Sequence, residues 1–242
     1  MKLYVYCLTA GIDALPHALR GIDGAEVRLL KARDFTAVVS SFAGERVAVN
    51  RENVLAHSAV AQNLLAQTTP LPFRFGVLAT EEQLESFLTA RHDALKERLN
   101  LVGGCVEMSV KVISRATDGS DGHHDQVSGR PEDKPGTAFL LEKRRELLGS
   151  EARTAEAREL VSWLESQTGN LVRQTQINTN ITDKLLISAA HLVDRGVMEQ
   201  YRARLKQVRN ERPDLNILVS GPWPPYSFAN INLEVATQFG VS

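Results

Sequence analysis

One histidine, one arginine and one glutamate are the side chains of this sequence with the most potential for acid–base chemistry. His57 lies in a stretch with helical periodicity. Arg74 stands between two phenylalanines, and Glu107 lies in an alternating, strand-like run. Together they could supply a base, an acid and a group that binds anions. Because no nucleophile elbow, phosphate loop or pair of carboxylates accompanies them, their spacing favours no reaction, and we expect a protein that is not an enzyme.

His57 and Arg74 each have two possible interpretations. His57 falls on the apolar face of its predicted helix, where a histidine is either a ligand or catalytic group, or a hydrogen-bonded core residue. Arg74 could bind an anion or an acidic partner, and it could equally pair with a carboxylate of its own fold.

No metal or cofactor site is expected. His123, His124 and Asp125 are adjacent on a polar stretch, and neighbouring side chains on a loop make a poor cage for an ion. Cys7 and Cys105 lack the close spacing of metal sites and redox pairs. We interpret them as buried free thiols of a reducing cytosol.

The most distinctive stretch of the chain carries aromatic rings on a stiff backbone. An apolar run at 215–219 leads into Gly221, and prolines follow at three of the next four positions. Proline fixes φ and lacks an N–H group, so we expect the strand to stop at Gly221 and the chain to leave the sheet. Trp223, Tyr226 and Phe228 are then held in place at little entropic cost, either to seal a core or to present a contact surface.

The N-terminal half predicts a small sheet backed by helices. Strands are expected at 3–9, 25–30 and 35–42, followed by a helix at 51–67 with Asn50 as its N-cap. A second helix begins with a capping box formed by Thr80 and Gln83 and ends before Gly103. Period-two alternation across 69–77 places Phe73 and Phe75 on one side and Arg74 on the other. A half-buried strand at 105–113 would close this unit.

The C-terminal half predicts a second unit of mixed structure. Residues 115–136 contain almost nothing apolar and are expected to form a mobile linker or exposed loop. A long helix at 137–167, strands at 171–177, 183–193 and 215–219, and a helix at 196–209 follow. The fold class is therefore α+β with two domains. These are an N-terminal α+β domain at 1–114 and, at 137–242, a long helix followed by a modified ferredoxin-like sandwich with a C-terminal tail.

Composition excludes several classes of partner. The 242 residues carry 28 basic and 29 acidic side chains, a formal net charge of −1, so no overall field recruits nucleic acid or an anionic membrane. No segment approaches the roughly 20 continuous apolar residues of a membrane span, and the N-terminus does not look like a signal peptide. We expect a cytoplasmic protein without membrane insertion.

Several motifs together resemble one known family. The run GPWPPYSF at 221–228, LPFRFG at 71–76, LYVY at 3–6 and VEMSVKV at 106–112 are similar to the gas vesicle protein F/L family, written GvpF/GvpL. The resemblance covers nearly the whole chain, and the C-terminal motif is its most specific part. The sequence departs from the family pattern just after Gly76, where Val77 and Leu78 replace a threonine and a later phenylalanine. The departure leaves open whether the chain is F-like or L-like.

The resemblance implies an accessory or minor structural protein of gas vesicle assembly that binds the hydrophobic shell protein and other accessory proteins. The alternative from the residues alone is a ferredoxin-like module that senses a ligand or regulates without catalysis, and it would need a pocket with convergent polar groups. Candidate residues for the interaction surface, or for the seam between the domains, are Phe73, Arg74, Phe75, Pro222, Trp223, Pro224, Pro225, Tyr226 and Phe228.

Overall fold

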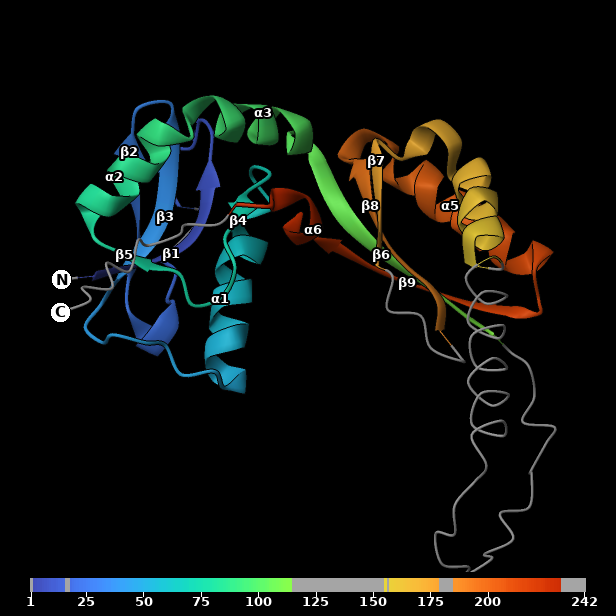
Figure 1. Ribbon diagram of the computed structural model, residues 1–242, viewed down its shortest axis with the longest axis horizontal. Coiled ribbons are helices and arrows are strands. Elements are labelled where there is room, and N and C mark those ends of the chain that lie inside the picture. The colour runs from blue at the N-terminus through green and yellow to red at the C-terminus, as the bar shows by residue number, and fades with distance from the viewer. Residues whose placement is uncertain (1, 16–17, 115–154, 156, 179–184, 232–242) are drawn as a thin grey trace, which may run out of the picture.

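The chain folds around two antiparallel sheets, each covered by helices, which lie side by side as two lobes (Figure 1). The computed structural model describes residues 2–15, 18–114, 155, 157–178 and 185–231. The predicted α+β class is confirmed. Within the described residues no helix is both long and apolar enough to cross a membrane.

The first sheet is centred on β1 (Lys2–Thr9), whose residues from Leu3 to Thr9 are all buried. This burial on both faces explains why its sequence hardly alternates. The sheet has the order β2-β3-β1-β4, with β5 also paired to β1. The other strands are β2 (Val27–Ala32), β3 (Phe35–Phe42), β4 (Leu71–Pro72) and β5 (Leu78–Ala79).

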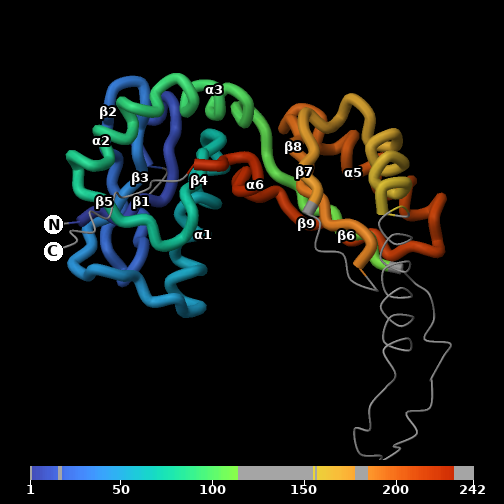
Figure 2. Tube along the Cα trace, viewed as in Figure 1, coloured from blue at the N-terminus to red at the C-terminus, as the bar shows by residue number. Residues whose placement is uncertain are grey.

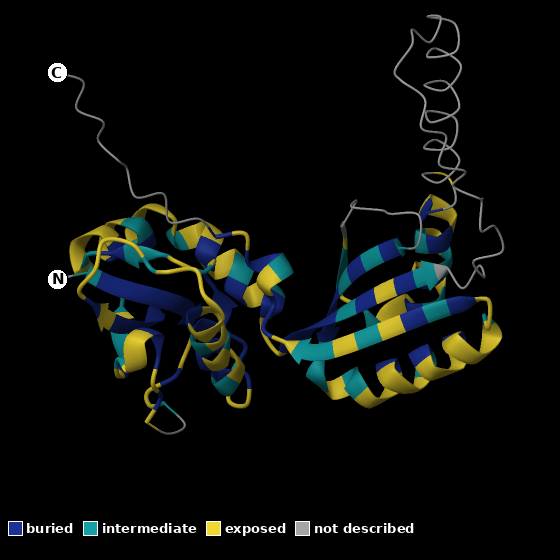
Figure 3. Cartoon of the chain, turned by 90° about the horizontal axis from the view of Figure 1, so that it is seen from below, coloured by how far each residue is buried: buried dark blue, intermediate teal, exposed yellow. Residues whose placement is uncertain are grey.

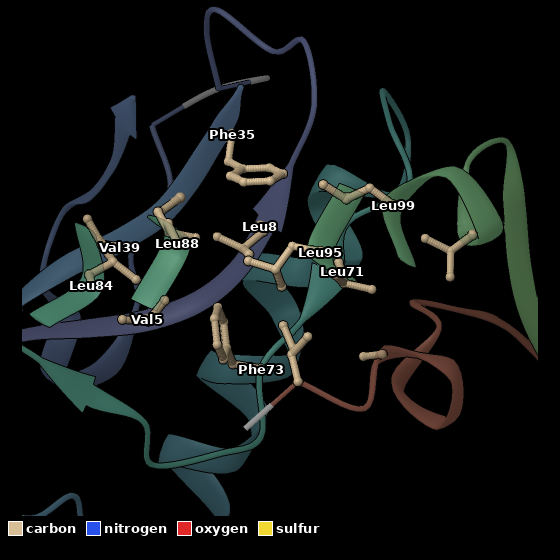
Figure 4. Packing of buried hydrophobic residues seen from close by; sticks show 14 of the residues in the cluster. Val5, Leu8, Phe35, Val39, Leu71, Phe73, Leu84, Leu88, Leu95 and Leu99 are labelled. Carbon is tan, nitrogen blue, oxygen red and sulfur yellow. The ribbon is translucent and has the colours of Figure 1, made fainter. Parts of the chain in front are cut away.

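Helices cover both faces of this sheet. Helix α1 (Arg51–Leu64) packs on one face, and Asn50 caps it by accepting a hydrogen bond from Asn53 N at 2.8 Å, as predicted. Helices α2 (Glu81–Ala90) and α3 (His92–Val102) pack on the other face, and Figure 4 shows their leucines directed at β1 and β3. The predicted capping box at the start of α2 is also present.

The single helix predicted after residue 80 is wrong, because two helices occupy that stretch. Arg91 leaves the helical conformation, with φ −112° and ψ 14°, and α3 begins anew at His92. Leu84 and Leu88 from α2 and two leucines of α3 nevertheless face one core. The spacing of apolar residues predicts which face of a helix is buried. It does not reveal a break between two consecutive helices that bury the same face.

The strand predicted to close the first sheet belongs instead to the second. Strand β6 (Cys105–Ser114) pairs with β8 (Leu185–Asp194) on one side and β9 (Leu215–Trp223) on the other. The sheet order is β7-β8-β6-β9, with β7 (Gln174–Asn178) at one edge. The alternation in β6 correctly predicted its buried face, but alternation does not identify the sheet to which a strand belongs.

Helical residues 157–168 and helix α5 (Met198–Glu211) contribute buried side chains to the core on one face of this second sheet. Figure 3 shows buried and exposed residues alternating along the strands of the second sheet. A short 3-10 turn, Gly169–Leu171, ends the first helical stretch, and another, Arg195–Val197, leads into α5. The predicted linker at 115–136, the first part of the long helix and the candidate metal ligands His123, His124 and Asp125 lie outside the described residues, as does the tail beyond Ile231.

The prediction that β9 stops at Gly221 is wrong, because the strand continues to Trp223. Ser220 pairs with Ser109 and Trp223 pairs with Glu107, so Gly221 and Pro222 form a bulge opposite a single residue of β6. Gly221 has φ +126°, and a Cβ at this position would lie 2.8 Å from the Glu107 carbonyl oxygen. The Gly221–Pro222 peptide bond is cis. A proline is tolerated at this bulge because β9 is an edge strand.

Candidate functional site

The segments 71–75 and 222–228, predicted separately as aromatic motifs, meet between the two lobes. After β9 the chain forms a short helix, α6 (Tyr226–Ala229), which contacts β4 of the first lobe. Figures 1 and 2 show α6 between the two sheets, beside the start of β6. The C-terminal motif therefore joins the lobes at a seam.

Phe73 and Phe228 form the buried part of this seam. Both are fully buried in the core cluster that α2 and α3 cover, and the ring of Phe73 lies 6.1 Å from that of Phe87. The same cluster contains Cys105 of β6 and Leu192 of β8. The first lobe and the second sheet thus share one apolar core at this point.

Phe75 does not lie beside Phe73 as the alternation predicted. It packs on the opposite face of the first sheet, where its ring lies 6.3 Å from Tyr4 and 5.9 Å from His57. The strand β4 ends at Pro72 and the chain turns at Phe75 and Gly76, so period-two alternation does not extend across the motif. Arg74 is exposed between them.

Hydrogen bonds hold α6 and the end of β9 in place. The carboxylate of Glu107 accepts one bond from the Ser227 N–H and another from the Ser227 hydroxyl, both at 2.8 Å. Burial of Glu107 raises the pKa of its carboxyl, and the two bonds from Ser227 act in the opposite direction. Gln62 on α1 donates to the Pro222 carbonyl at 3.2 Å. The prolines at 224 and 225 are buried.

No local pattern indicates that Glu107 anchors α6. It stands at a position of β6 that alternation assigns to the polar face, and its partner Ser227 is 120 residues away. A carboxylate near the start of an alternating strand was the available signal.

Two arginines of the second lobe also fasten the seam, and sequence reasoning missed both. The Arg195 guanidinium donates to the carbonyl of Leu65, to that of Thr68 at 3.1 Å and to the Thr69 hydroxyl at 3.3 Å. These groups follow directly on α1, where backbone carbonyls lack partners within the helix and carry a partial negative charge.

Arg173 serves the end of α3 in the same way. Its guanidinium donates to the carbonyls of Leu101 at 2.8 Å and Gly103 at 3.0 Å, and pairs with Asp194 at 3.1 Å. Both helices that approach the second sheet therefore end against one of its arginines. Each guanidinium group lies at a helix C-terminus, where a positive charge stabilises the helix.

Replacing Arg195 with methionine should lower the free energy of unfolding by about 2 kcal/mol, because several carbonyl and hydroxyl partners lose a charged donor. Chemical denaturation followed by circular dichroism measures this change. Arg202, whose partner among the described residues is Glu199 in an exposed ion pair, provides the matched control, and its replacement with methionine should cost less than about 0.5 kcal/mol. An equal effect of the two substitutions would contradict a fastening role for Arg195.

His57 occupies the core position that was one of its two interpretations. It is 3% exposed, and its Nδ1 lies 2.8 Å from the hydroxyl of Tyr4, which also accepts a bond from the Gly76 N–H. Burial lowers the pKa of His57 to about 4. His191 forms a matching pair with Tyr201 in the second lobe. Both histidines are thus neutral at physiological pH and enclosed, away from solvent.

Trp223 and Tyr226 differ from the rest of the motif because they reach the surface. Trp223 is 45% exposed and Tyr226 is 36% exposed. Burial raises the pKa of Tyr226 to about 12, so this hydroxyl stays uncharged. The Tyr226 ring lies 6.1 Å from His57 of α1. Trp223 is therefore not a buried plug of the seam.

One face of α1 carries exposed apolar side chains. Leu55 is 56% exposed, and Ala59 is also exposed. Their spacing places them on the same helical face as Gln62, which donates to the Pro222 carbonyl beside Trp223. We refer to Leu55, Ala59, Trp223 and Tyr226 as the apolar edge. Its chemistry suits contact with an apolar partner and supplies no acid, base or nucleophile.

In the part of the chain that the structure describes, no three histidine, cysteine or acidic side chains lie close enough together to hold a metal ion. The cysteines at 7 and 105 are both buried and free.

Comparison with known proteins gives consistent matches over nearly the full length. A family model described as gas vesicle synthesis protein GvpL/GvpF matches residues 2–230. Gas vesicle protein F1 of Halobacterium salinarum is 26% identical over 99% of this chain and 98% of its own length. Gas vesicle protein L of a Streptomyces species is 29% identical over 96% and 94%.

Solved structures share the fold. The crystal structure of gas vesicle protein GvpF from Anabaena sp. PCC7120 superposes with a TM-score of 0.76 at 19% identity, covering 96% of this chain and 97% of that one. The GvpF structure from Microcystis aeruginosa gives a TM-score of 0.73 at 19% identity, covering 95% and 99%. F and L proteins both appear among the relatives, so the matches do not separate the two branches.

Proposed function

Because the chain belongs to the GvpL/GvpF family of gas vesicle synthesis proteins, we propose that it binds the hydrophobic shell protein during gas vesicle assembly, through its apolar edge. It acts there as an accessory or minor structural protein of the cytoplasm and of the vesicle, together with other accessory proteins. It is not an enzyme. A role in gas vesicle assembly itself follows from family membership.

The half-exposed Trp223 is the observation that carries this proposal. A shell subunit has apolar surface that must be covered before it joins the wall, and large aromatic side chains in a partly buried setting are common anchors for such contacts. Hydrogen bonds from Gln62 to Pro222 and from Ser227 to Glu107 fix the backbone on both sides of Trp223. Its ring is thus presented without the entropy cost of ordering a loop.

The other predicted residues take different parts in this proposal. Phe73, Phe228, Pro224 and Pro225 are buried, and the two phenylalanines pack in the core that α2 and α3 cover. They hold the C-terminal motif at the seam. Phe75 supports it through His57, which also contacts Tyr226. The role of Arg74 is separate and is taken up below.

We also propose that the second lobe is a ferredoxin-like domain. Its elements follow the order strand, helix, two strands, helix, strand, and the sheet order β7-β8-β6-β9 places the first and third of these strands at the centre. This division would move the boundary predicted at residue 114 to a point before Cys105. The support is topological, and limited proteolysis of the intact protein would test it.

Replacing Trp223 with alanine should weaken binding to the shell protein about 30-fold, the loss expected for an anchor worth about 2 kcal/mol. The melting temperature should change little, because the side chain is 45% exposed. Pull-down and titration with purified shell protein, alongside thermal unfolding, measure the two effects.

Trp163 offers a matched control, because it is the other tryptophan of the chain and stacks with Arg212 on the second lobe. Its replacement should leave shell binding unchanged. If Trp223→Ala instead lowers the melting temperature strongly, the ring supports the fold and the docking proposal is wrong. Unchanged binding in a stable Trp223→Ala protein would be equally decisive against it.

A further inference from the structure

Two adjoining cavities run along α3 and the chain that follows α6. One has a volume of about 280 Å³ and lies against Phe87, Arg91 and Leu95. The other, of about 420 Å³, opens at the seam beside Arg74 and Gln176. Arg98, Asn230 and Ile231 line both. We refer to the pair as the arginine groove.

Charge in the arginine groove is unbalanced. Three guanidinium groups, those of Arg74, Arg91 and Arg98, line it, and among the described residues no carboxylate lines either cavity. Across the described residues none of the three makes an ion pair or hydrogen bond, whereas Arg173, Arg195, Arg204 and Arg209 all bond to the protein. The side chain of Arg98, which has no such partner, is half-buried. A partly desolvated cation without a partner favours binding of an anion.

The spacing of the cations indicates the size of that anion. Arg91 caps the start of α3 and Arg98 lies seven positions further along, a rise of about 10 Å. Leu95 lies between them, and Phe87 and Ile231 add further apolar surface. An acidic peptide can engage both guanidinium groups. Glutamates three positions apart share one face of a helical turn, with Cβ atoms about 5–6 Å apart, and the long side chains of glutamate and arginine span the rest of the separation. A neighbouring leucine can then meet the apolar floor.

Nucleic acid fits the groove less well. The apolar floor carries one aromatic ring, Phe87, instead of a platform on which bases could stack, and the chain as a whole has a formal net charge of −1. The combination of paired cations and an apolar floor matches a peptide that carries both acidic and aliphatic side chains.

We propose that the arginine groove binds an acidic, leucine-containing segment of a partner protein, with carboxylates on Arg91 and Arg98 and Arg74 extending the site across the seam. This goes beyond the proposed function. It requires no contact with the shell protein, so the two proposals can fail separately.

The test uses a fluorescein-labelled peptide, GELLELG, and the full-length protein, with binding followed by anisotropy at low salt. We expect measurable binding that weakens as salt rises, because exposed charge pairs are screened. Arg98→Gln should weaken it about tenfold and Arg91→Gln about threefold, as expected for loss of charge-assisted bonds at a half-buried and an exposed site. Arg28→Gln, an exposed arginine on β2 at the far edge of the first sheet, should have no effect.

A charge reversal guards against loss of folding as the cause. Arg98→Glu should reject GELLELG and gain affinity for the same peptide with lysine in place of glutamate. Equal binding of a peptide with glutamine in place of glutamate would overturn the proposal. So would displacement of the peptide by inorganic phosphate or by a single-stranded oligonucleotide of equal charge.

Discussion

Phe228→Ala is expected to lower the free energy of unfolding by about 3–5 kcal/mol, the usual cost of truncating a fully buried phenylalanine. Phe228 is 0% exposed and packs in the cluster that unites Leu71 and Phe73 of the first lobe with Cys105 and Leu192 of the second sheet. Its removal leaves a cavity at the point where the lobes meet. Because one core is shared there, both lobes lose packing together.

Urea denaturation followed by circular dichroism gives the change in free energy. Tyr226, two residues earlier in α6 and 36% exposed, serves as the matched control, and its truncation should cost about 1 kcal/mol. Hydrogen exchange adds a local measurement, since release of α6 should expose the Ser227 N–H that now bonds to Glu107. A loss below about 1.5 kcal/mol, or retained protection at Ser227, would mean that α6 is fixed without Phe228.

Local signals in the sequence predicted most of the elements. The N-cap at Asn50 and the capping box at Thr80 and Gln83 each depend on residues within one turn, and both are present. Buried strands such as β1 and β3 were recognisable from continuous runs of β-forming residues. Periodicity also placed His57 on the buried face of α1. These features require no knowledge of the rest of the fold.

Features that depend on distant residues were predicted poorly. The alternation of β6 fixed its buried face, yet the partners of β6 are β8 and β9, more than 70 residues further along the chain. The expectation that prolines end β9 at Gly221 failed because the bulge opposite Met108 accommodates Gly221 and Pro222 within the strand. A local rule about proline gives way when the residue occupies a bulge at a sheet edge.

The same distinction applies to the site. The sequence identified the aromatic residues at 73 and 228, whose types alone mark them as suited to packing. It did not identify Arg173 and Arg195, because an arginine that caps a helix 70 or 130 residues away leaves no local pattern. The sequence also did not predict which aromatic side chains are exposed. Trp223 and Phe228 belong to one motif, yet Phe228 is buried and Trp223 is 45% exposed.

Acid should destabilise the protein strongly between about pH 6.5 and pH 4, through the two buried histidines. Burial lowers the pKa of His57 and of His191 to about 4, from an ordinary value of 6.5. As the pH falls through this window, the two histidines bind protons in the unfolded chain and remain neutral in the folded chain. The free energy of unfolding therefore decreases. Each histidine contributes a loss of about 3 kcal/mol by pH 4, and the pair about 6 kcal/mol. Below pH 4 the two contributions are complete.

Other groups act in the same range with different signs. Glu107 has a raised pKa, so the folded chain binds its proton first and gains some stability as the pH falls. His92 behaves likewise, because the hydrogen bonds that it donates to the carboxylates of Asp93 and Asp34 raise its pKa, although its exposure keeps the effect small. Asp13, Asp34 and Asp214 have lowered pKa values and lose their contributions at lower pH, after the histidine window.

His57→Gln and His191→Gln isolate the histidine contribution, because each removes one titrating group and retains a side chain that can bond to its tyrosine. Urea midpoints measured from pH 7.5 to pH 4 should show that either variant loses about half of the wild-type decrease in stability, and the double variant nearly all of it. His92→Gln is the control, and it should leave the decrease intact or make it slightly steeper, because His92 opposes it. A double variant as acid-sensitive as the wild type would show that both buried histidines gain protons freely in the folded state, which their enclosure beside Tyr4 and Tyr201 argues against.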